Sequence, residues 1–247
     1  MSFKVVIPAR YASARLPGKP LLDIAGKPMV VRVAEQAAKS GASEIVIATD
    51  FEKIMQAAAE HHVKAVMTRL DHASGTDRIA EVAQKLNWAD DEIVVNVQGD
   101  EPLIDPKLIQ EVAQHLADSN DAVMATACHA IHDEASLLNP NIVKVVIDAY
   151  GNALYFSRAP IPYPRDDAHK ANIHAHRHIG IYAYRVSFLK KYAQLSLTEL
   201  EIIECLEQLR VLHHGYKIGV TVTANAPASG VDTQTDLDYV RSVFKDR

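Results

Sequence analysis

Three basic residues lie close together near the start of the chain and could bind an anion. Arg10, Arg15 and Lys19 fall within ten residues, directly after the apolar, β-branched segment 4–7. The formal net charge of the protein is -5 at pH 7, so this positive charge is a local feature. Pro8 prevents the segment from continuing into a helix, and ligands of open α/β sheets bind beyond the carboxyl ends of strands. The cluster predicts an anion-binding loop, with a solvated turn as the alternative.

Neither of two common phosphate-binding motifs accounts for this loop. A dinucleotide fingerprint needs G-x-G-x-x-G directly after the strand, and the first glycine of the chain is Gly18. A P-loop needs G-x-x-x-x-G-K-[ST], but Ser13 stands at its first glycine position and Pro20 at its hydroxyl position. Both motifs are therefore absent.

A second loop, Asp71 to Arg78, could also face an anion. It follows the segment 63–67, which reads as a strand, and Ser74 or Gly75 can begin the next helix. The free N–H groups at a helix start can face a phosphate or a base edge. A plain capped helix is the alternative.

A third loop places a carboxylate beyond a strand. The segment 96–102, NVQGDEP, ends the predicted strand 92–97, and Asp100 lies just past its apolar part. A carboxylate placed there beside a polyphosphate is suited to bind Mg²⁺, and a turn aspartate is the alternative. The three loops follow strands of one sheet and would line one crevice.

The elements that must position these loops alternate in the first half of the chain. Strands are predicted at 4–7, 44–48, 63–67 and 92–97, and helical patterns lie at 28–39, 51–61 and 79–86. After Cys128 the strands come in succession, at 142–147, 153–156 and 177–185, with an aperiodic segment at 157–174. We therefore expect one α/β domain over 1–247, with a mostly parallel, Rossmann-like sheet, helices on both faces and a smaller mixed β-rich part.

Composition excludes several classes of protein. Hydrophobic residues make up 48% and charged residues 23%, which is typical of a soluble globular protein. Cys128 and Cys205 lie in an apolar run and a helical pattern, which indicates neither a disulfide framework nor a metal site and fits a reducing cytosol. Met1 and Ser2 lead directly into the first strand, so we expect a cytoplasmic protein without a secretory signal, and neither a membrane nor a nucleic acid as partner.

The segment 7–21, IPARYASARLPGKPL, resembles the signature loop of the sugar-activating nucleotidyltransferases. More narrowly, it is similar to the branch of cytidylyltransferases that activate 3-deoxy-manno-octulosonate (Kdo), and the similarity covers essentially the whole chain. The resemblance implies an enzyme that uses CTP, Kdo and Mg²⁺ to form CMP-Kdo for lipopolysaccharide biosynthesis, and a homodimer. It also implies a nucleotide-binding half of about 1–128 and a sugar-binding and dimerisation half of about 129–247.

Matching motif positions carry the family's roles onto this chain. Those for the nucleotide are Ala9, Arg10, Arg15, Lys19, Ser74, Gly75, Arg78 and Gln98; those for the metal are Asp100 and Asp232; those taken as catalytic are Arg10, Lys19, Asp100 and Asp232. By pattern alone Asp232 would be the N-cap of the last helix. The chain departs from its relatives at Ala14, where a hydroxyl residue is common, and at Gln234, where proline is usual.

The second half is expected to hold the sugar. The resemblance assigns this role to Gln98, Arg158, His178, Tyr182, Glu207 and Gln208, with Arg158 on the sugar-acid carboxylate. Strand alternation places His178 and Tyr182 on the face opposite the core residues Ile179 and Ile181. By pattern alone Arg158 could be a surface residue. Glu207 and Gln208 lie on a different face of the predicted helix 206–212 from its leucines, and by pattern alone they could be solvated. A zinc site at 174, 176 and 178 is a further alternative.

The predicted reaction is in-line attack of the Kdo 2-hydroxyl on the α-phosphorus of CTP, with pyrophosphate leaving and no covalent enzyme intermediate. Three other functions stay open. A related cytidylyltransferase could act on neuraminate or 8-amino-Kdo. A glycosyltransferase would usually carry Asp-x-Asp, which Gly99-Asp100-Glu101 does not provide. A non-catalytic nucleotide-binding module would not need both Asp100 and Asp232.

Overall fold

The computed structural model describes residues 1–11, 16–72, 74–166, 174–224, 226–228 and 230–245. The strands are β1 (Lys4–Ala9), β2 (Asp23–Ile24), β3 (Lys27–Pro28), β4 (Glu44–Thr49), β5 (Lys64–Met67), β6 (Ile93–Asn96), β7 (Ala122–Ile131), β8 (Lys144–Ile147), β9 (Ala153–Ser157), β10 (Ala175–Arg185) and β11 (Lys217–Val222). The helices are α1 (Met29–Ala38), α2 (Glu52–Glu60), α3 (Gly75–Lys85), α4 (Pro106–Asp118), α5 (Glu134–Leu138), α7 (Val186–Tyr192), α8 (Glu199–Glu204), α9 (Gln208–His213) and α10 (Gln234–Lys245), with a 3₁₀ turn η1 (Lys19–Leu21).

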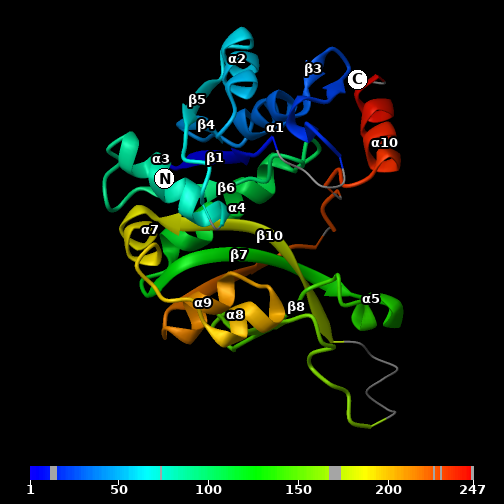
Figure 1. Ribbon diagram of the computed structural model, residues 1–247. Coiled ribbons are helices and arrows are strands. Elements are labelled where there is room, and N and C mark those ends of the chain that lie inside the picture. The colour runs from blue at the N-terminus through cyan, green and yellow to red at the C-terminus, as the bar shows by residue number, and fades with distance from the viewer. Residues whose placement is uncertain (12–15, 73, 167–173, 225, 229, 246–247) are drawn as a thin grey trace.

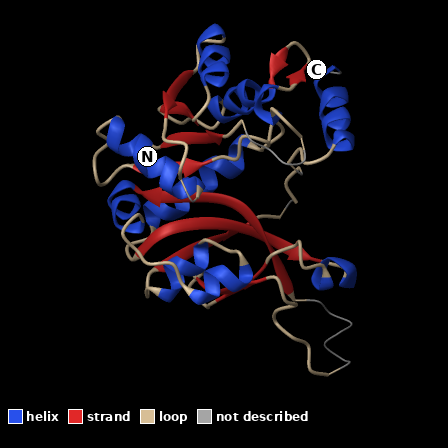
Figure 2. Cartoon of the chain, in the orientation of Figure 1, coloured by secondary structure: helices blue, strands red, loops and turns tan. Residues whose placement is uncertain are grey.

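One large sheet runs through the molecule, with helices on both faces (Figure 1, Figure 2). Its strand order is β11-β7-β10-β6-β1-β4-β5. Strand β1 is parallel to β4 and β6, β4 to β5, and β11 to β7. Strand β10 is antiparallel to both of its neighbours in this order, β6 and β7. The expected mostly parallel α/β sheet is therefore confirmed.

The smaller β-rich part is built on one end of β10. Strands β8 and β9 form an antiparallel pair, and β8 also pairs with the start of β10 at Arg177 and His176. The three successive strands predicted after Cys128 are thus present. Residues 167–173 of the intervening segment lie outside the described residues.

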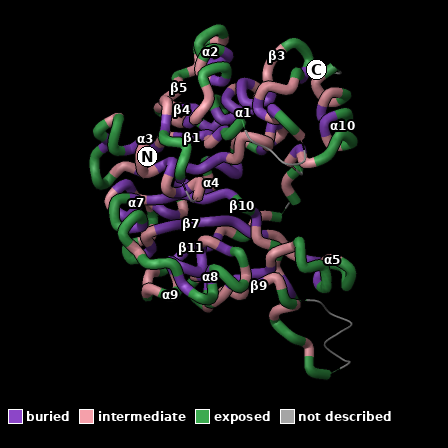
Figure 3. The backbone as a smooth tube through the Cα atoms, in the orientation of Figure 1, coloured by how far each residue is buried: buried purple, intermediate pink, exposed green. Residues whose placement is uncertain are grey.

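Both faces of the sheet are buried, which explains why its strands are continuous apolar runs. Val5 and Ile7 of β1 belong to the hydrophobic core under α1, α2 and α4, whereas Val6 belongs to the core under α3, α7 and α9. In the tube drawing, the buried strands form one layer between exposed helical surfaces (Figure 3). The predicted alternation in β10 is also found, since Ile181 lies in the first core and Tyr182 in the second.

The C-terminal helix α10 packs back on the segment that follows the first loop. Leu237 and Val240 form a third core with Ile24, Met29 and Val231. This packing carries residues near position 232 to the end of β1, across almost the full length of the chain. In the described parts of the chain, no helix has the length and apolar character needed to span a bilayer.

Candidate active site

Three charged side chains from distant segments meet beyond the ends of β1 and β6. The Lys19 ammonium donates to Asp100 Oδ2 at 2.6 Å and to Asp232 Oδ1 at 3.0 Å. The Lys19 side chain is only 12% exposed, so the contact is partly shielded from water. Two carboxylates therefore face one cation at the predicted crevice.

Backbone geometry aims these groups at one another. Gly18 has a φ of 66°, a left-handed conformation that glycine adopts readily, and it starts the η1 turn that carries Lys19. A Cβ at Gly99 would lie 2.8 Å from the Pro8 carbonyl oxygen, so only glycine lets this loop pack on β1. The Val231 N–H donates to the Asp100 carbonyl at 2.8 Å, which joins the third loop to the segment before α10.

Asp232 is not the N-cap of α10, and the pattern-based interpretation is wrong on this point. Thr233 Oγ1 accepts from the Asp236 N–H at 3.2 Å, and Asp236 Oδ2 accepts from the Thr233 N–H at 2.8 Å. This reciprocal pair forms a capping box, so the Asp232 carboxylate can turn to Lys19. Gln234 begins α10, so the absence of a proline at this position does not prevent the helix from starting here.

Arg10 connects the first loop to the second. Its Nη2 donates to the carbonyl oxygens of His72 at 2.9 Å and Ser74 at 3.3 Å. Ser74 caps α3 through a capping box with Asp77, as the helix-start prediction required. A Cβ at Gly75 would be 4.0 Å from its nearest contact, Asn96 Nδ2, so the start of α3 is open on that side.

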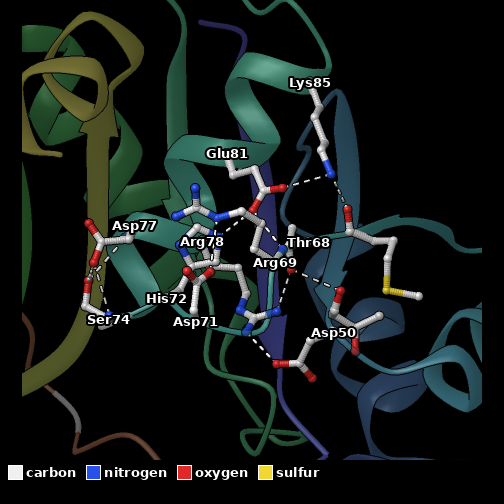
Figure 4. Close-up of polar contacts among 12 residues, drawn as sticks. Asp50, Thr68, Arg69, Asp71, His72, Ser74, Asp77, Arg78, Glu81 and Lys85 are labelled. Carbon is white, nitrogen blue, oxygen red and sulfur yellow. Dashed lines mark hydrogen bonds and ion pairs between the residues drawn. The ribbon is translucent and has the colours of Figure 1, made fainter.

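The second loop is braced from inside by Arg78 (Figure 4). Arg78 is fully buried, and its guanidinium donates to Asp50 Oδ2 at 2.6 Å and to the Thr68 hydroxyl. This arrangement ties the start of α3 to the ends of β4 and β5. A direct nucleotide contact by Arg78 stays a prediction, because its described contacts are internal.

A histidine–glutamate pair supports the same loop on its outer side. His72 Nε2 contacts Glu81 Oε2, and Lys85 pairs with Glu81 Oε1 at 2.8 Å (Figure 4). Burial opposes ionisation of Glu81, but hydrogen bonds from Lys85, from the Arg69 N–H and from His72 outweigh it and lower its pKa to about 2. Glu81 is therefore a fixed negative charge at neutral pH.

His178 is a half-buried side chain of β10. Its Nε2 is 2.9 Å from Thr126 Oγ1, and this hydroxyl also lies 2.7 Å from the Ile181 carbonyl and 3.2 Å from the Ile179 carbonyl. With the Thr126 proton assigned to one of these carbonyls, His178 donates from Nε2, which leaves the Nδ1 lone pair as an acceptor. Burial lowers the pKa of His178 to about 3, so the ring is neutral at pH 7.

Helix α9 begins at Gln208, two residues later than the start of the predicted helix, because Cys205 adopts a left-handed φ of 52° and ends α8. Gln208 is 2% exposed, and its Nε2 has no hydrogen-bond partner among the described residues. Burial raises the pKa of Glu207, against a hydrogen bond with Thr76. The solvated alternative is therefore wrong for Gln208, whereas Glu207 is half-buried.

The structure places the remaining predicted residues individually, and their shared role in one site stays a prediction. Gln98 Nε2 donates to the Gly180 carbonyl at 3.4 Å and so spans from the third loop to β10. Ala9 is buried at the end of β1, where it can offer only backbone. Arg158 is half-buried at the end of β9. Arg15 and Ala14 lie outside the described residues.

One site residue was not anticipated from the sequence. Glu101 follows Asp100 directly, and burial together with the Asp100 charge raises the pKa of Glu101 to about 8. Glu101 is therefore mostly protonated at neutral pH, so the pair presents one negative charge instead of two. An ordinary G-D-E turn in the sequence carries no signal of this burial.

The Asp100 and Asp232 carboxylates are a suitable donor set for a divalent cation, since both already turn to the Lys19 ammonium. Within the described residues, no three histidine, cysteine, aspartate or glutamate side chains lie close enough together to hold a metal ion. The zinc site considered at 174, 176 and 178 is therefore not formed. Any ion held by Asp100 and Asp232 would take its other ligands from substrate phosphates or water.

Comparisons with known proteins place this geometry in a family. A cytidylyltransferase family model matches residues 4–218. A structure of CMP:2-keto-3-deoxy-manno-octonic acid synthetase complexed with CTP superposes with a TM-score of 0.91, at 46% identity over 99% of this chain and 98% of that chain. A cytidylyltransferase from Leptospira borgpetersenii serovar Hardjo-bovis (strain JB197) has a TM-score of 0.63 at 17% identity, covering 100% of this chain and 87% of that chain, which supports the fold alone. Since the family match spans most of its length, the chain belongs to the cytidylyltransferase family.

Proposed function

We propose that this cytidylyltransferase activates Kdo with CTP, giving CMP-Kdo and pyrophosphate, and that it serves lipopolysaccharide biosynthesis in the cytoplasm. The observation that carries the proposal is the convergence of Lys19, Asp100 and Asp232, which come from three distant segments and meet beyond the ends of β1 and β6. The relative at 46% identity is a synthetase of CMP-Kdo in complex with CTP, and this supports both the base and the sugar.

The nucleotide would lie between the first two loops. Arg10, Arg15 and Lys19 offset the negative charge of the triphosphate and of the departing pyrophosphate. Gly75 offers its backbone N–H at the start of α3, next to Ser74, whose own N–H donates to Asp77 Oδ2 at 3.1 Å. Arg10 already spans from the first loop to the second, so both loops can close on one ligand.

The reaction is a single in-line displacement. The anomeric 2-hydroxyl of Kdo attacks the α-phosphorus and releases its proton to water, the bond from that phosphorus to the β-phosphate oxygen breaks, and pyrophosphate leaves. The chain contributes positioning and charge neutralisation, because no side chain in the described part of the site is set up as a covalent nucleophile.

Asp100 and Asp232 would hold Mg²⁺, and their common orientation towards one cation is the observation that fits this role. Bound Mg²⁺ supplies a Lewis acid that polarises the α-phosphate and lowers the pKa of the attacking hydroxyl. With an ion held by these carboxylates, the Lys19 ammonium would be available to a phosphate.

The sugar would lie against β10, the end of β9 and the start of α9. Arg158 holds the sugar-acid carboxylate, and Gln98, His178, Tyr182, Glu207 and Gln208 contact the hydroxyl groups. Gln208 provides a buried N–H donor without a described partner, and His178 provides an acceptor at Nδ1. A polyhydroxylated acid satisfies both groups, which an apolar acceptor does not.

We also propose a homodimer formed through the half at 129–247, with the nucleotide bound by the half at 1–128. Light scattering at micromolar concentration should give about twice the 27.2 kDa mass of one chain. A mass of one chain would contradict the dimer without affecting the reaction.

The test of the function is pyrophosphate release with Mg²⁺ and CTP. Kdo is compared with 8-amino-Kdo and neuraminate, and UTP and ATP replace CTP as controls. Release that requires both CTP and Kdo supports the proposal. Faster release with neuraminate would move the function to another sugar acid, and sugar-independent CTP binding without release would indicate a non-catalytic module.

A further inference from the structure

Two glutamates of the short helix α8 lie one turn apart and bond to two different elements, Glu201 to α9 and Glu204 to the end of β9. Glu201 and Glu204 are spaced i, i+3, so they extend from neighbouring positions on the helix. The helix ends at Cys205, whose left-handed conformation turns the chain sharply towards α9. Because α8 carries no predicted substrate contact, its two carboxylates call for another explanation.

Glu201 fixes α8 to α9. Arg210 Nε donates to Glu201 Oε2 at 2.7 Å and Arg210 Nη2 to Glu201 Oε1 at 2.6 Å, a bidentate pair. The Arg210 and Glu201 side chains are 7% and 10% exposed. A paired, buried contact of this kind holds the two helices in one relative position, and α9 carries Gln208 at its start.

Glu204 fixes the same helix to the end of β9. Its Oε1 accepts from Ser157 Oγ at 2.6 Å, and its Oε2 accepts from the Arg158 N–H at 2.9 Å. Its backbone carbonyl accepts from Arg158 Nε at 2.7 Å. One residue of α8 therefore holds both the backbone and the guanidinium of Arg158.

Two further contacts complete the support of Arg158. Its Nη1 donates to the Pro140 carbonyl at 3.0 Å. Lys144 is fully buried, and its ammonium donates to the Arg158 carbonyl at 2.6 Å, to the Ile142 carbonyl at 2.6 Å and to the Asn139 carbonyl at 3.0 Å. Among the described residues Nη2 of Arg158 has no hydrogen-bond partner, so that edge of the guanidinium is the one available to a ligand.

We propose that Glu204 is a positioning residue that sets the separation between the Arg158 guanidinium and the Glu207–Gln208 pair, and thereby the fit of the sugar acid between its carboxylate and its hydroxyls. The inference deepens the proposed function and rests on it. Through Glu201 and Glu204, α8 links Arg158 to the start of α9, where Glu207 and Gln208 lie. Within the described residues, neither the first nor the second loop contacts Glu204. Loss of the link should therefore affect the sugar more than CTP.

The experiment compares KM values for sugar acid and CTP in matched variants of the full-length protein. Glu204→Ala should raise the sugar KM about tenfold or more, because small misplacements of an orienting group carry large kinetic effects. The CTP KM should change by less than about twofold. Glu204→Gln keeps one acceptor for the Arg158 N–H and should recover most of the loss. Glu199→Ala, at an exposed glutamate in the first turn of α8, is the control and should match the wild type.

Arg158→Ala is the reference variant. It removes the proposed contact between the guanidinium and the sugar-acid carboxylate, so it should raise the sugar KM at least as much as Glu204→Ala does. If Glu204→Ala does not fold, as judged by circular dichroism, Ser157→Ala removes one of the same hydrogen bonds and should raise the sugar KM alone. Equal changes in both KM values, or none in either, would overturn the positioning role. A wild type that turns over no sugar acid would instead contradict the proposed function, and the inference with it.

Discussion

The Lys19 ammonium lies 2.6 Å from the Asp100 carboxylate although 81 residues separate them in sequence. Asp232 completes the contact from 213 residues away. The Lys19 ammonium thus lies between the same two carboxylates that are proposed to bind the metal ion. Binding of Mg²⁺ would exchange one cation for another between the same two carboxylates.

Replacement of Asp100 should slow turnover strongly and spare the fold. Asp100→Asn keeps the shape of the side chain but removes the charge that holds the metal, so we expect the rate to fall by about a hundredfold to a thousandfold. Pyrophosphate release measures the rate, and circular dichroism checks the fold. Near-normal turnover with Mg²⁺ would contradict the metal role.

Removal of the Lys19 charge should make stability depend on Mg²⁺. Lys19→Met takes away the ammonium that bridges the Asp100 and Asp232 carboxylates, so the melting temperature should fall in EDTA and recover when Mg²⁺ is added. Lys27→Met is the matched control, because Lys27 pairs with Glu35 at a more exposed position. An equal Mg²⁺ response in both variants would place the ion elsewhere.

Gly99 should tolerate no side chain. A Cβ there would lie 2.8 Å from the Pro8 carbonyl oxygen, and backbone has to move to relieve it. Gly99→Ala should therefore lower the free energy of unfolding by about 1–3 kcal/mol and reduce turnover. In urea titrations, Gly180→Ala serves as the stability control, since a Cβ at Gly180 would meet no atom of the described residues within 4 Å. An unchanged midpoint for Gly99→Ala would rule out the tight packing.

His178 should contribute to loss of stability in acid. Burial lowers its pKa from 6.5 to about 3, so between these values the unfolded chain binds a proton that the folded protein does not. Its effect is absent above pH 6.5, and it destabilises the fold as pH falls towards 3, by up to about 1.4 kcal/mol per pH unit.

His178→Gln should therefore flatten the decline in unfolding free energy below pH 6.5, as measured by urea denaturation across pH. His132→Gln, at an exposed histidine, should follow the wild-type curve. An acid decline of the same slope in the His178 variant would show that this ring does not titrate in the folded protein as described.

Local pattern was sufficient for much of the fold. The apolar run before Pro8, the capping signal at Ser74 and the alternation around Tyr182 each predicted an element that the structure contains. These signals depend on residues within one turn or one strand. Helix α4 also begins at a local signal, with Asp105 as its N-cap and Pro106 as its first residue.

Contacts between distant segments could not be predicted in this way. Asp232 looks like an N-cap, and only the three-dimensional position of Lys19 reveals its other partner. Glu204 is an ordinary helical glutamate in sequence, and its role follows from where β9 ends. The metal pair was assigned through family resemblance, because no spacing rule connects positions 100 and 232.

The most direct test of the proposed reaction is ³¹P NMR of the enzyme with Mg²⁺, CTP and Kdo. We expect CTP signals to decline while a sugar phosphodiester and pyrophosphate appear in equal amounts, and we expect Asp100→Asn to form both products far more slowly. Formation of CMP and pyrophosphate without the phosphodiester, or of no product from CTP and Kdo, would contradict the proposal.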